Sequence, residues 1–169
     1  MTDVVDPATR SRMMAGIRGK DTAPELALRG ALHGAGFRFR LHAKELPGRP
    51  DLILPRWRAA VQVHGCFWHR HRGCRYATSP ATRPEFWTAK FAGNVERDAR
   101  NHAALRALGW RVATVWECAL SRDRLAGSVT ELKEWIQNGD EEIEVGILEA
   151  GGGNAVTARS QAHPPRPAD

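Results

Sequence analysis

The sequence predicts an α/β fold in which helices flank a mixed β-sheet. Hydrophobic residues make up 42% of the 169 residues, which is typical of a globular chain. Short apolar runs of strand length follow or precede longer amphipathic segments, and the order between residues 22 and 116 is helix, three strands, helix, strand. Short apolar strands between helices are typical of α/β layer structures. The length suits one domain with a sizeable core.

The first helix and the three strands are predicted from local signals. Residues 22–25 (Thr-Ala-Pro-Glu) form a capping box with proline in the first turn, so an amphipathic helix should begin there and end near residues 34–36. Residues 37–41 alternate apolar and polar side chains, which indicates a strand with one apolar face. Two further short buried strands are predicted at residues 51–54 and 59–63.

The second half of the predicted fold begins with a helix over residues 85–108. Gly93 is expected to break this helix, with Asn94 beginning its second part. The β-branched and aromatic run at residues 111–116 predicts a strand. A last helix is predicted over residues 120–136, broken near Gly127.

The charge of the chain favours a polyanionic partner. Lys and Arg total 25 against 19 Asp and Glu, for a net charge of +6. Phosphate groups neutralised by such residues release counterions, which favours nucleic-acid binding. The alternative is an arginine-rich composition that serves only solubility. No apolar run is long enough to span a bilayer, and the first nine residues lack the apolar stretch of a signal peptide, so we expect a cytoplasmic protein.

Cysteine and histidine spacing indicates a metal site. Cys66, His71 and Cys74 lie within nine residues, and Cys118 follows the predicted strand at 111–116. An odd number of cysteines in a cytoplasmic chain argues against a disulfide framework. Three cysteines and one histidine are a legitimate set for structural Zn²⁺. His69 is an alternative histidine ligand, and three merely buried cysteines are the alternative to a metal site.

A second motif concerns Asp51, which follows Pro50 at the start of a predicted strand. The next strand ends in Gln62-Val63-His64, so the pattern resembles the Pro-Asp…(Asp/Glu)-x-Lys motif of restriction-endonuclease-like nucleases. Such a carboxylate suits Mg²⁺, which prefers oxygen ligands. Gln62 and His64 stand where that motif has an acid and a lysine. The site is therefore either inactive or a histidine-based variant, and an ordinary turn aspartate is the third interpretation.

Several short motifs together resemble one family, the very-short-patch repair (Vsr) endonucleases. The resemblance covers about residues 2–135, and its most specific part is His64-Gly65-Cys66-Phe67-Trp68-His69. The other matching segments lie at residues 8–11, 21–22, 47–51, 81–83, 85–87, 94–98, 109–112 and 115–120. One departure is an extra residue before Cys74, for which Gly73 is the expected insertion, and glycine bulges at little cost.

The resemblance implies roles for the polar residues. It assigns Mg²⁺ binding to the Asp51 carboxylate and the Val63 backbone carbonyl. It makes His69 the general base, with Glu25 orienting or tuning it, and has His64 assist at the scissile phosphate. The structural Zn²⁺ ligands that it implies are Cys66, His71, Cys74 and Cys118. Glu25 also has the simpler explanation of closing the capping box.

The resemblance also implies residues that contact DNA. Phe67, Trp68 and Trp87 are expected to wedge into the duplex beside a mismatch, with core packing as the alternative. Arg70 and Arg72 are expected to contact phosphates. Trp110, Trp116 and Trp135 are expected in the core.

The function implied is an Mg²⁺-dependent endonuclease that nicks double-stranded DNA 5′ to the thymine of a T:G mismatch. Such mismatches arise when 5-methylcytosine deaminates, and the nick starts very-short-patch repair. Alternatives are a zinc-stabilised DNA-binding module without activity and a restriction-type nuclease without mismatch preference. We expect a monomer, with mismatch-repair proteins as further partners. The expected parts are a DNA-contacting arm (1–20), an endonuclease domain (21–148) and a disordered tail (149–169).

Overall fold

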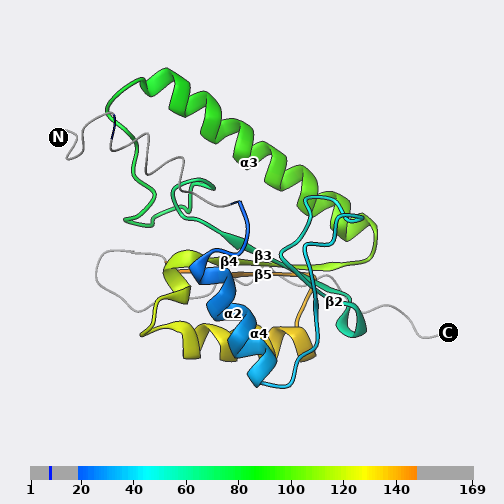
Figure 1. Ribbon diagram of the computed structural model, residues 1–169. Coiled ribbons are helices and arrows are strands. Elements are labelled where there is room, and N and C mark those ends of the chain that lie inside the picture. Colours follow the sequence, from blue (N-terminus) through cyan, green and yellow to red (C-terminus); the bar gives the residue numbers. More distant parts are fainter. Residues whose placement is uncertain (1–7, 9–18, 148–169) are drawn as a thin grey trace.

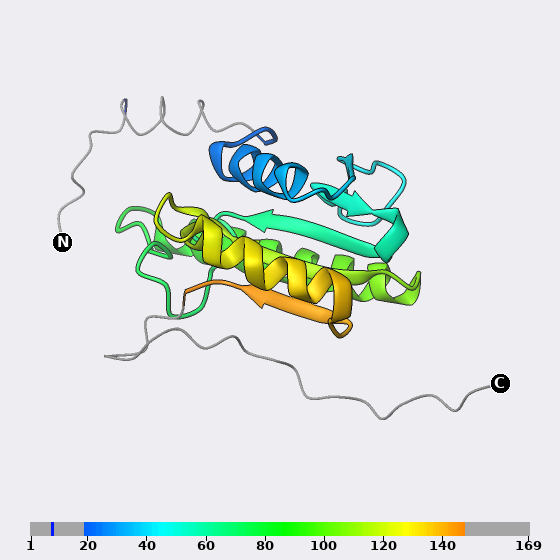
Figure 2. The same cartoon turned by 90° about the horizontal axis from the view of Figure 1, so that it is seen from below.

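A five-stranded sheet lies between two layers of helices (Figure 1). The computed structural model describes residue 8 and residues 19–147. One long helix covers one face of the sheet, and two shorter helices lie side by side on the other face (Figure 2). This arrangement confirms the predicted α/β fold. Nearly all of the expected arm and the whole expected tail lie outside the described residues. Within the described part, no helix is long and apolar enough to cross a membrane.

The sheet is mixed, as predicted, and its strands are ordered along it as they are in the chain. The first three strands pair antiparallel, and the third, fourth and fifth pair parallel. The strands are Arg40–Leu41 (β1), Leu52–Leu54 (β2), Ala59–His64 (β3), Arg111–Trp116 (β4) and Glu142–Val145 (β5). Because β3 and β4 are parallel, the segments that follow them leave the sheet at the same edge.

The helices correct two expectations. The α-helices that flank the sheet are Ala23–Gly34 (α2), Pro84–Ala107 (α3) and Leu125–Asn138 (α4), and the short 3₁₀ turns are Pro55–Trp57 (η1) and Glu117–Leu120 (η2). The predicted break at Gly93 was wrong, because the Asn94 side chain donates to the Trp68 carbonyl at 3.0 Å and begins no new helix. The break near Gly127 was also wrong, since α4 begins only at Leu125 and continues through it.

Alternating strand residues supply two cores, one on each face of the sheet. On one face, Val61 and Val115 pack with residues of α2 and α4 such as Leu32 and Leu132. On the other face, buried residues of the sheet pack with Leu105 of α3. Trp116 and Trp135 are buried, as predicted, and Trp110 is half-buried against the second core.

Strand β5 was missed by the sequence analysis. Its four residues are Glu-Ile-Glu-Val, with only two apolar side chains, and Val145 alone is buried. Its strand conformation comes from parallel pairing with β4, whose paired residues lie 30 positions earlier in the chain, so the local sequence carries little of the signal.

Candidate active site and metal centre

Asp51 lies just before β2, in a cleft of about 610 Å³ between α2, α3 and the ends of the first strands. Its Oδ2 accepts a hydrogen bond from the backbone N–H of Val63 on β3 at 2.7 Å. Burial raises the pKa of this carboxyl to about 6; the Val63 hydrogen bond opposes that shift and the charge of Glu25 adds to it. A carboxylate that is poorly solvated and close to another acid is a favourable ligand for a cation.

The turn before Asp51 depends on Gly48. This residue has φ +72°, and a Cβ there would lie 2.9 Å from the side chain of Asn101 on α3. A larger residue would be strained in its backbone and would collide with α3. The turn therefore presses against α3 and brings Asp51 to the floor of the cleft.

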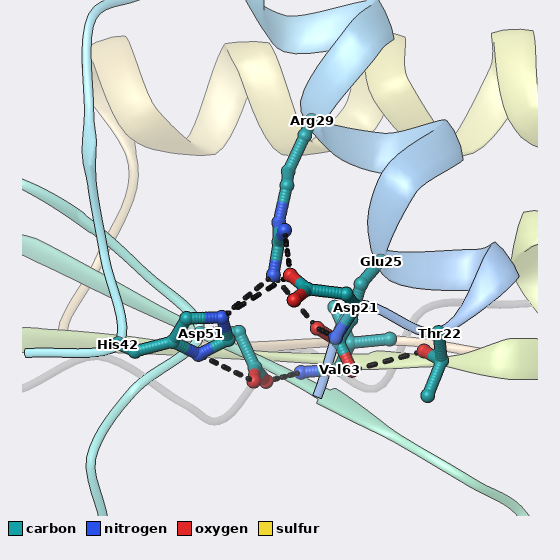
Figure 3. A network of polar contacts seen from close by, with 7 residues as sticks. All are labelled: Asp21, Thr22, Glu25, Arg29, His42, Asp51 and Val63. Carbon is teal, nitrogen blue, oxygen red and sulfur yellow. Dashed lines mark hydrogen bonds and ion pairs between the residues drawn. The ribbon is translucent and has the colours of Figure 1, made fainter. Parts of the chain in front are cut away.

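Glu25 lines the same cleft from the first turn of α2 and is 5% exposed. Its carboxylate accepts hydrogen bonds from the Asp21 backbone N–H at 2.9 Å, the Thr22 hydroxyl at 2.9 Å and Arg29 at 2.8 Å (Figure 3). The predicted capping box does not form, because the Thr22 hydroxyl bonds the Glu25 carboxylate and not the helix backbone, and Glu25 accepts the backbone N–H of Asp21 instead of that of Thr22. Glu25 thus lies at the helix start and lines the cleft, while the residue that contacts His69 is Asp98.

His64 and His69 stack beside Asp51, and Asp98 on α3 completes the group. The two imidazole rings lie 3.9 Å apart and nearly parallel. His69 Nδ1 and Asp98 Oδ2 are joined at 2.5 Å. Burial lowers the pKa of His64 to about 3, and neighbouring His69 adds to this shift. Burial acts to raise the pKa of Asp98, but the hydrogen bond and charge of His69 outweigh it, so that pKa is lowered.

Asp98 is a site residue to which the sequence analysis gave no role. It lies one helical turn after Asn94, on the same face of α3. Asn94 bonds the carbonyl of Trp68 and Asp98 bonds the ring of the next residue, His69. The available signal was the four-residue spacing of Asn94 and Asp98, which places both side chains on one face of the helix. Nothing near them in the sequence connected them with His69.

Gln62, at the acidic position of the nuclease motif, is neutral and buried. Its Oε1 accepts a hydrogen bond from Nε2 of His102 on α3 at 2.7 Å. Burial lowers the pKa of His102, which favours the neutral ring. Gln62 therefore links β3 to α3, and the acids that line the cleft are Asp51, Glu25 and Asp98.

Cys66, His71, Cys74 and Cys118 come together behind the cleft, with ligand atoms all within 4.8 Å of one another. His71 Nδ1 lies 3.6 Å from Cys66 Sγ and 3.4 Å from Cys118 Sγ. Ligands about 2.1–2.3 Å from a tetrahedral zinc ion are separated by roughly 3.4–3.8 Å. The four side chains thus fit a tetrahedral ion. The alternative histidine, His69, lies with Asp98 and not in this group.

The polypeptide around these four side chains is closely braced. Glu117, adjacent to Cys118, accepts the Cys66 backbone N–H at 2.9 Å. The His71 ring stacks on Trp116 with centroids 4.2 Å apart, and a Cβ at Gly146 would lie 2.7 Å from His71 Nε2. The end of β4 and the chain after β5 therefore fix the position of His71.

Comparison with known proteins gives a consistent result over most of the chain. A sequence model of the DNA mismatch endonuclease Vsr family matches residues 2–75. The Type II nicking enzyme V.XorIIP of Xanthomonas oryzae pv. oryzae is 51% identical over 121 residues, 72% of this chain and 88% of that protein. The DNA mismatch endonuclease Vsr of Escherichia coli is 50% identical over 139 residues, 80% of this chain and 88% of that protein. The chain belongs to the Vsr family of DNA mismatch endonucleases.

In this Vsr endonuclease the expected wedge residues form one aromatic cluster. Phe67 packs edge-on against Trp68 at 5.1 Å and Trp87 at 5.7 Å, and Phe91 of α3 lies beneath them. Phe67, Trp68 and Trp87 are half-buried, whereas Phe86 is 49% exposed. The cluster is therefore a partly open aromatic surface beside the cleft, held by α3.

The two arginines expected to contact phosphates differ in their surroundings. The Arg70 guanidinium lies over the Phe91 ring at 4.4 Å and donates to the Thr78 carbonyl at 2.7 Å. Arg72 is exposed. Arg70 thus braces the loop that follows β3, while Arg72 is accessible to a ligand in solution.

Proposed function

We propose that this Vsr endonuclease nicks duplex DNA 5′ to the thymine of a T:G mismatch left by deamination of 5-methylcytosine. The observation that carries the proposal is the cleft itself, in which a half-buried carboxylate, Asp51, lies beside a carboxylate-oriented imidazole, His69. This supports hydrolysis of a phosphodiester over DNA binding alone. Family membership supports nicking directed by a mismatch over cleavage of fully matched DNA.

Asp51 and the backbone carbonyl of Val63 would hold Mg²⁺. Both offer the oxygen ligands that this hard ion prefers, and the raised pKa of Asp51 reflects a carboxylate short of solvent. When bound, the ion would stabilise the negative charge that develops on the attacked phosphate.

His69 would act as the general base. Asp98 engages its Nδ1, which leaves Nε2 as the atom to take a proton from the attacking water. His64, whose lowered pKa keeps it uncharged near neutral pH, stacks on His69 and would lie against the scissile phosphate. Glu25, through its hydrogen bonds to Asp21 and Arg29, would fix the start of α2 where this helix lines the cleft.

Zn²⁺ would occupy the Cys66, His71, Cys74 and Cys118 group in a structural role. Four protein ligands leave no open position for a substrate, which is the pattern of structural zinc sites. The ion would fix the loop between β3 and α3, and this loop carries His69 and two of the wedge aromatics.

Recognition would divide between aromatic and basic residues. Phe67, Trp68 and Trp87 would stack beside the mismatch, where the wobble pair is easier to unstack. Arg72, Arg70 and the basic residues at the cleft rim would contact phosphates. Those rim residues are Lys20, Lys44, Arg49 and Arg97. The enzyme would act as a monomer in the cytoplasm, with mismatch-repair proteins as assisting partners.

The test uses two duplexes of one sequence that differ only in a T:G or T:A pair. The wild-type protein with Mg²⁺ should nick the T:G duplex 5′ to the thymine and leave the T:A duplex largely intact. Asp51→Asn should abolish nicking but retain DNA binding, because it removes a metal ligand and not a fold element. Equal cleavage of both duplexes would favour a nuclease without mismatch preference, and no cleavage by wild type would contradict the proposal.

A further inference from the structure

Arg29 on α2 is the centre of a partly buried polar network at the cleft (Figure 3). It is 8% exposed. Its NH1 donates to Asp21 Oδ1 at 2.6 Å and its NH2 donates to Glu25 Oε2 at 2.8 Å. The same NH2 lies 3.0 Å from Nε2 of His42. One guanidinium thus joins two carboxylates and an imidazole from three parts of the chain.

This arrangement places a cation of the protein where a metal ion would otherwise fit. Asp21, Glu25 and His42 offer ligand atoms close enough together to hold an ion. Arg29 already binds all three, and both oxygens of Glu25 accept hydrogen bonds. Glu25 is therefore an anchored carboxylate whose charge is balanced internally.

The contact with Arg29 also determines which nitrogen of His42 carries the proton. A guanidinium offers donors only, whereas Asp21 Oδ1, 3.5 Å from the same Nε2, can only accept; the shorter contact, 3.0 Å to Arg29, assigns Nε2 of His42 as the acceptor. The ring proton then lies on Nδ1, which faces Asp51 Oδ1 at 3.9 Å. That separation is longer than a hydrogen bond, and a small rotation of the ring would close it. Asp51 thus has Val63 N–H on one oxygen and a donor directed at the other.

The backbone holds His42 in this place. Its N–H donates to the Asp51 carbonyl at 3.1 Å, which extends the β1–β2 pairing by one residue. His42 has φ 48°, in the left-handed region that residues other than glycine seldom adopt. Such a conformation persists where surrounding contacts impose it, often at functional sites. Here those contacts are the Asp51 carbonyl and the Arg29 guanidinium.

We infer that Arg29 and His42 are positioning residues for the metal-binding carboxylate: Arg29 anchors Glu25 and fixes the His42 ring, and His42 Nδ1–H orients Asp51. This inference rests on the proposed role of Asp51. Residues that orient a ligand from behind contribute roughly 10–100-fold to metal affinity.

The first test reads the tautomer directly. Long-range ¹H–¹⁵N NMR of the full chain at about pH 8, without added Mg²⁺, should show the proton of His42 on Nδ1. Arg29→Lys keeps the positive charge but loses the forked N–H groups of the guanidinium, so the His42 ring should then populate both tautomers. A proton on Nε2 in the wild type, or an unchanged tautomer in Arg29→Lys, would overturn the inference.

The second test measures binding of Mn²⁺, as a probe of the Mg²⁺ site, by calorimetry without DNA. His42→Leu removes the donor and should weaken Mn²⁺ binding roughly tenfold. His42→Asn keeps an N–H near the place of Nδ1 and should bind close to wild type, as should His33→Asn, an exposed histidine of α2. Equal affinity in His42→Leu and wild type, with both folded, overturns the inference. Failure of wild type to nick a T:G duplex would instead count against the proposed function.

Discussion

The polypeptide between β3 and α3 supplies two sites of opposite character. His64 and His69 face an open cleft with Asp51, while Cys66 and His71, only two residues further along in each case, face a closed pocket with Cys118. The open group contains a carboxyl whose pKa is raised by burial, so its charge opposes folding. The closed group has a complete set of four ligands. One short loop thus contributes residues to two groups, one enclosed and one open to the cleft.

The largest expected effect is on the closed group. Cys118→Ser removes the ligand that joins the loop to the end of β4, so zinc should be lost and the melting temperature should fall steeply, because structural zinc contributes folding free energy. Elemental analysis and thermal unfolding check this. Asp51→Asn is the matched control and should keep about one zinc per chain. If wild-type protein holds no zinc and Cys118→Ser melts at the same temperature as wild type, the closed group is not a structural metal site.

The next effect concerns the open group alone. His69→Ala should lower the nicking rate by roughly 10² or more, and Asp98→Asn should also lower it severely because it releases the orientation of the ring. Neither variant should lose zinc. Both rates should be measured in single turnover on a T:G duplex. An Asp98→Asn rate near that of wild type would mean that the contact with His69 is only structural.

The closed group was easier to predict from the sequence than the open one. Three of the four metal-centre residues lie within nine positions, so spacing alone brought them together, and β4 was predicted with its observed ends, Arg111–Trp116. Asp98 lies 29 residues from His69 on another element, and its role follows only from packing of α3. The network of Arg29, Asp21 and His42 was missed for the same reason. Residue spacing reveals metal ligands that lie close together in the sequence. It does not reveal contacts between residues on different layers of the fold.

A smaller effect should separate mismatch selectivity from general affinity. Trp68→Ala removes one stacking surface, worth roughly 1–3 kcal/mol per base, so binding and nicking of T:G should fall more than those of T:A. Arg72→Ala, from the exposed side of the same loop, should weaken both duplexes similarly. Because Trp68 packs on Phe67 and its carbonyl is held by Asn94, thermal unfolding must accompany the assay. Equal losses on both duplexes would make Trp68 a packing residue.

The pH dependence of stability follows from Asp51. Its folded pKa of about 6 exceeds the ordinary value of 3.8, so the folded state binds the proton more tightly. The stabilisation is complete below about pH 4 and is lost as pH rises towards 6, at up to about 1.4 kcal/mol per pH unit. Between pH 4 and 6, wild type should therefore lose stability relative to Asp51→Asn. Nicking should rise over the same range, as the carboxylate becomes available.

The most direct measurement is thermal unfolding of wild type and Asp51→Asn at about pH 8, with zinc retained, with and without Mg²⁺. Without Mg²⁺ the variant should melt higher than wild type, because the buried charge is gone and asparagine still accepts the Val63 N–H. Mg²⁺ should raise the melting temperature of wild type but not that of the variant. A variant that melts lower than wild type without Mg²⁺, or equal stabilisation of both by the ion, would contradict the proposed metal-binding role of Asp51.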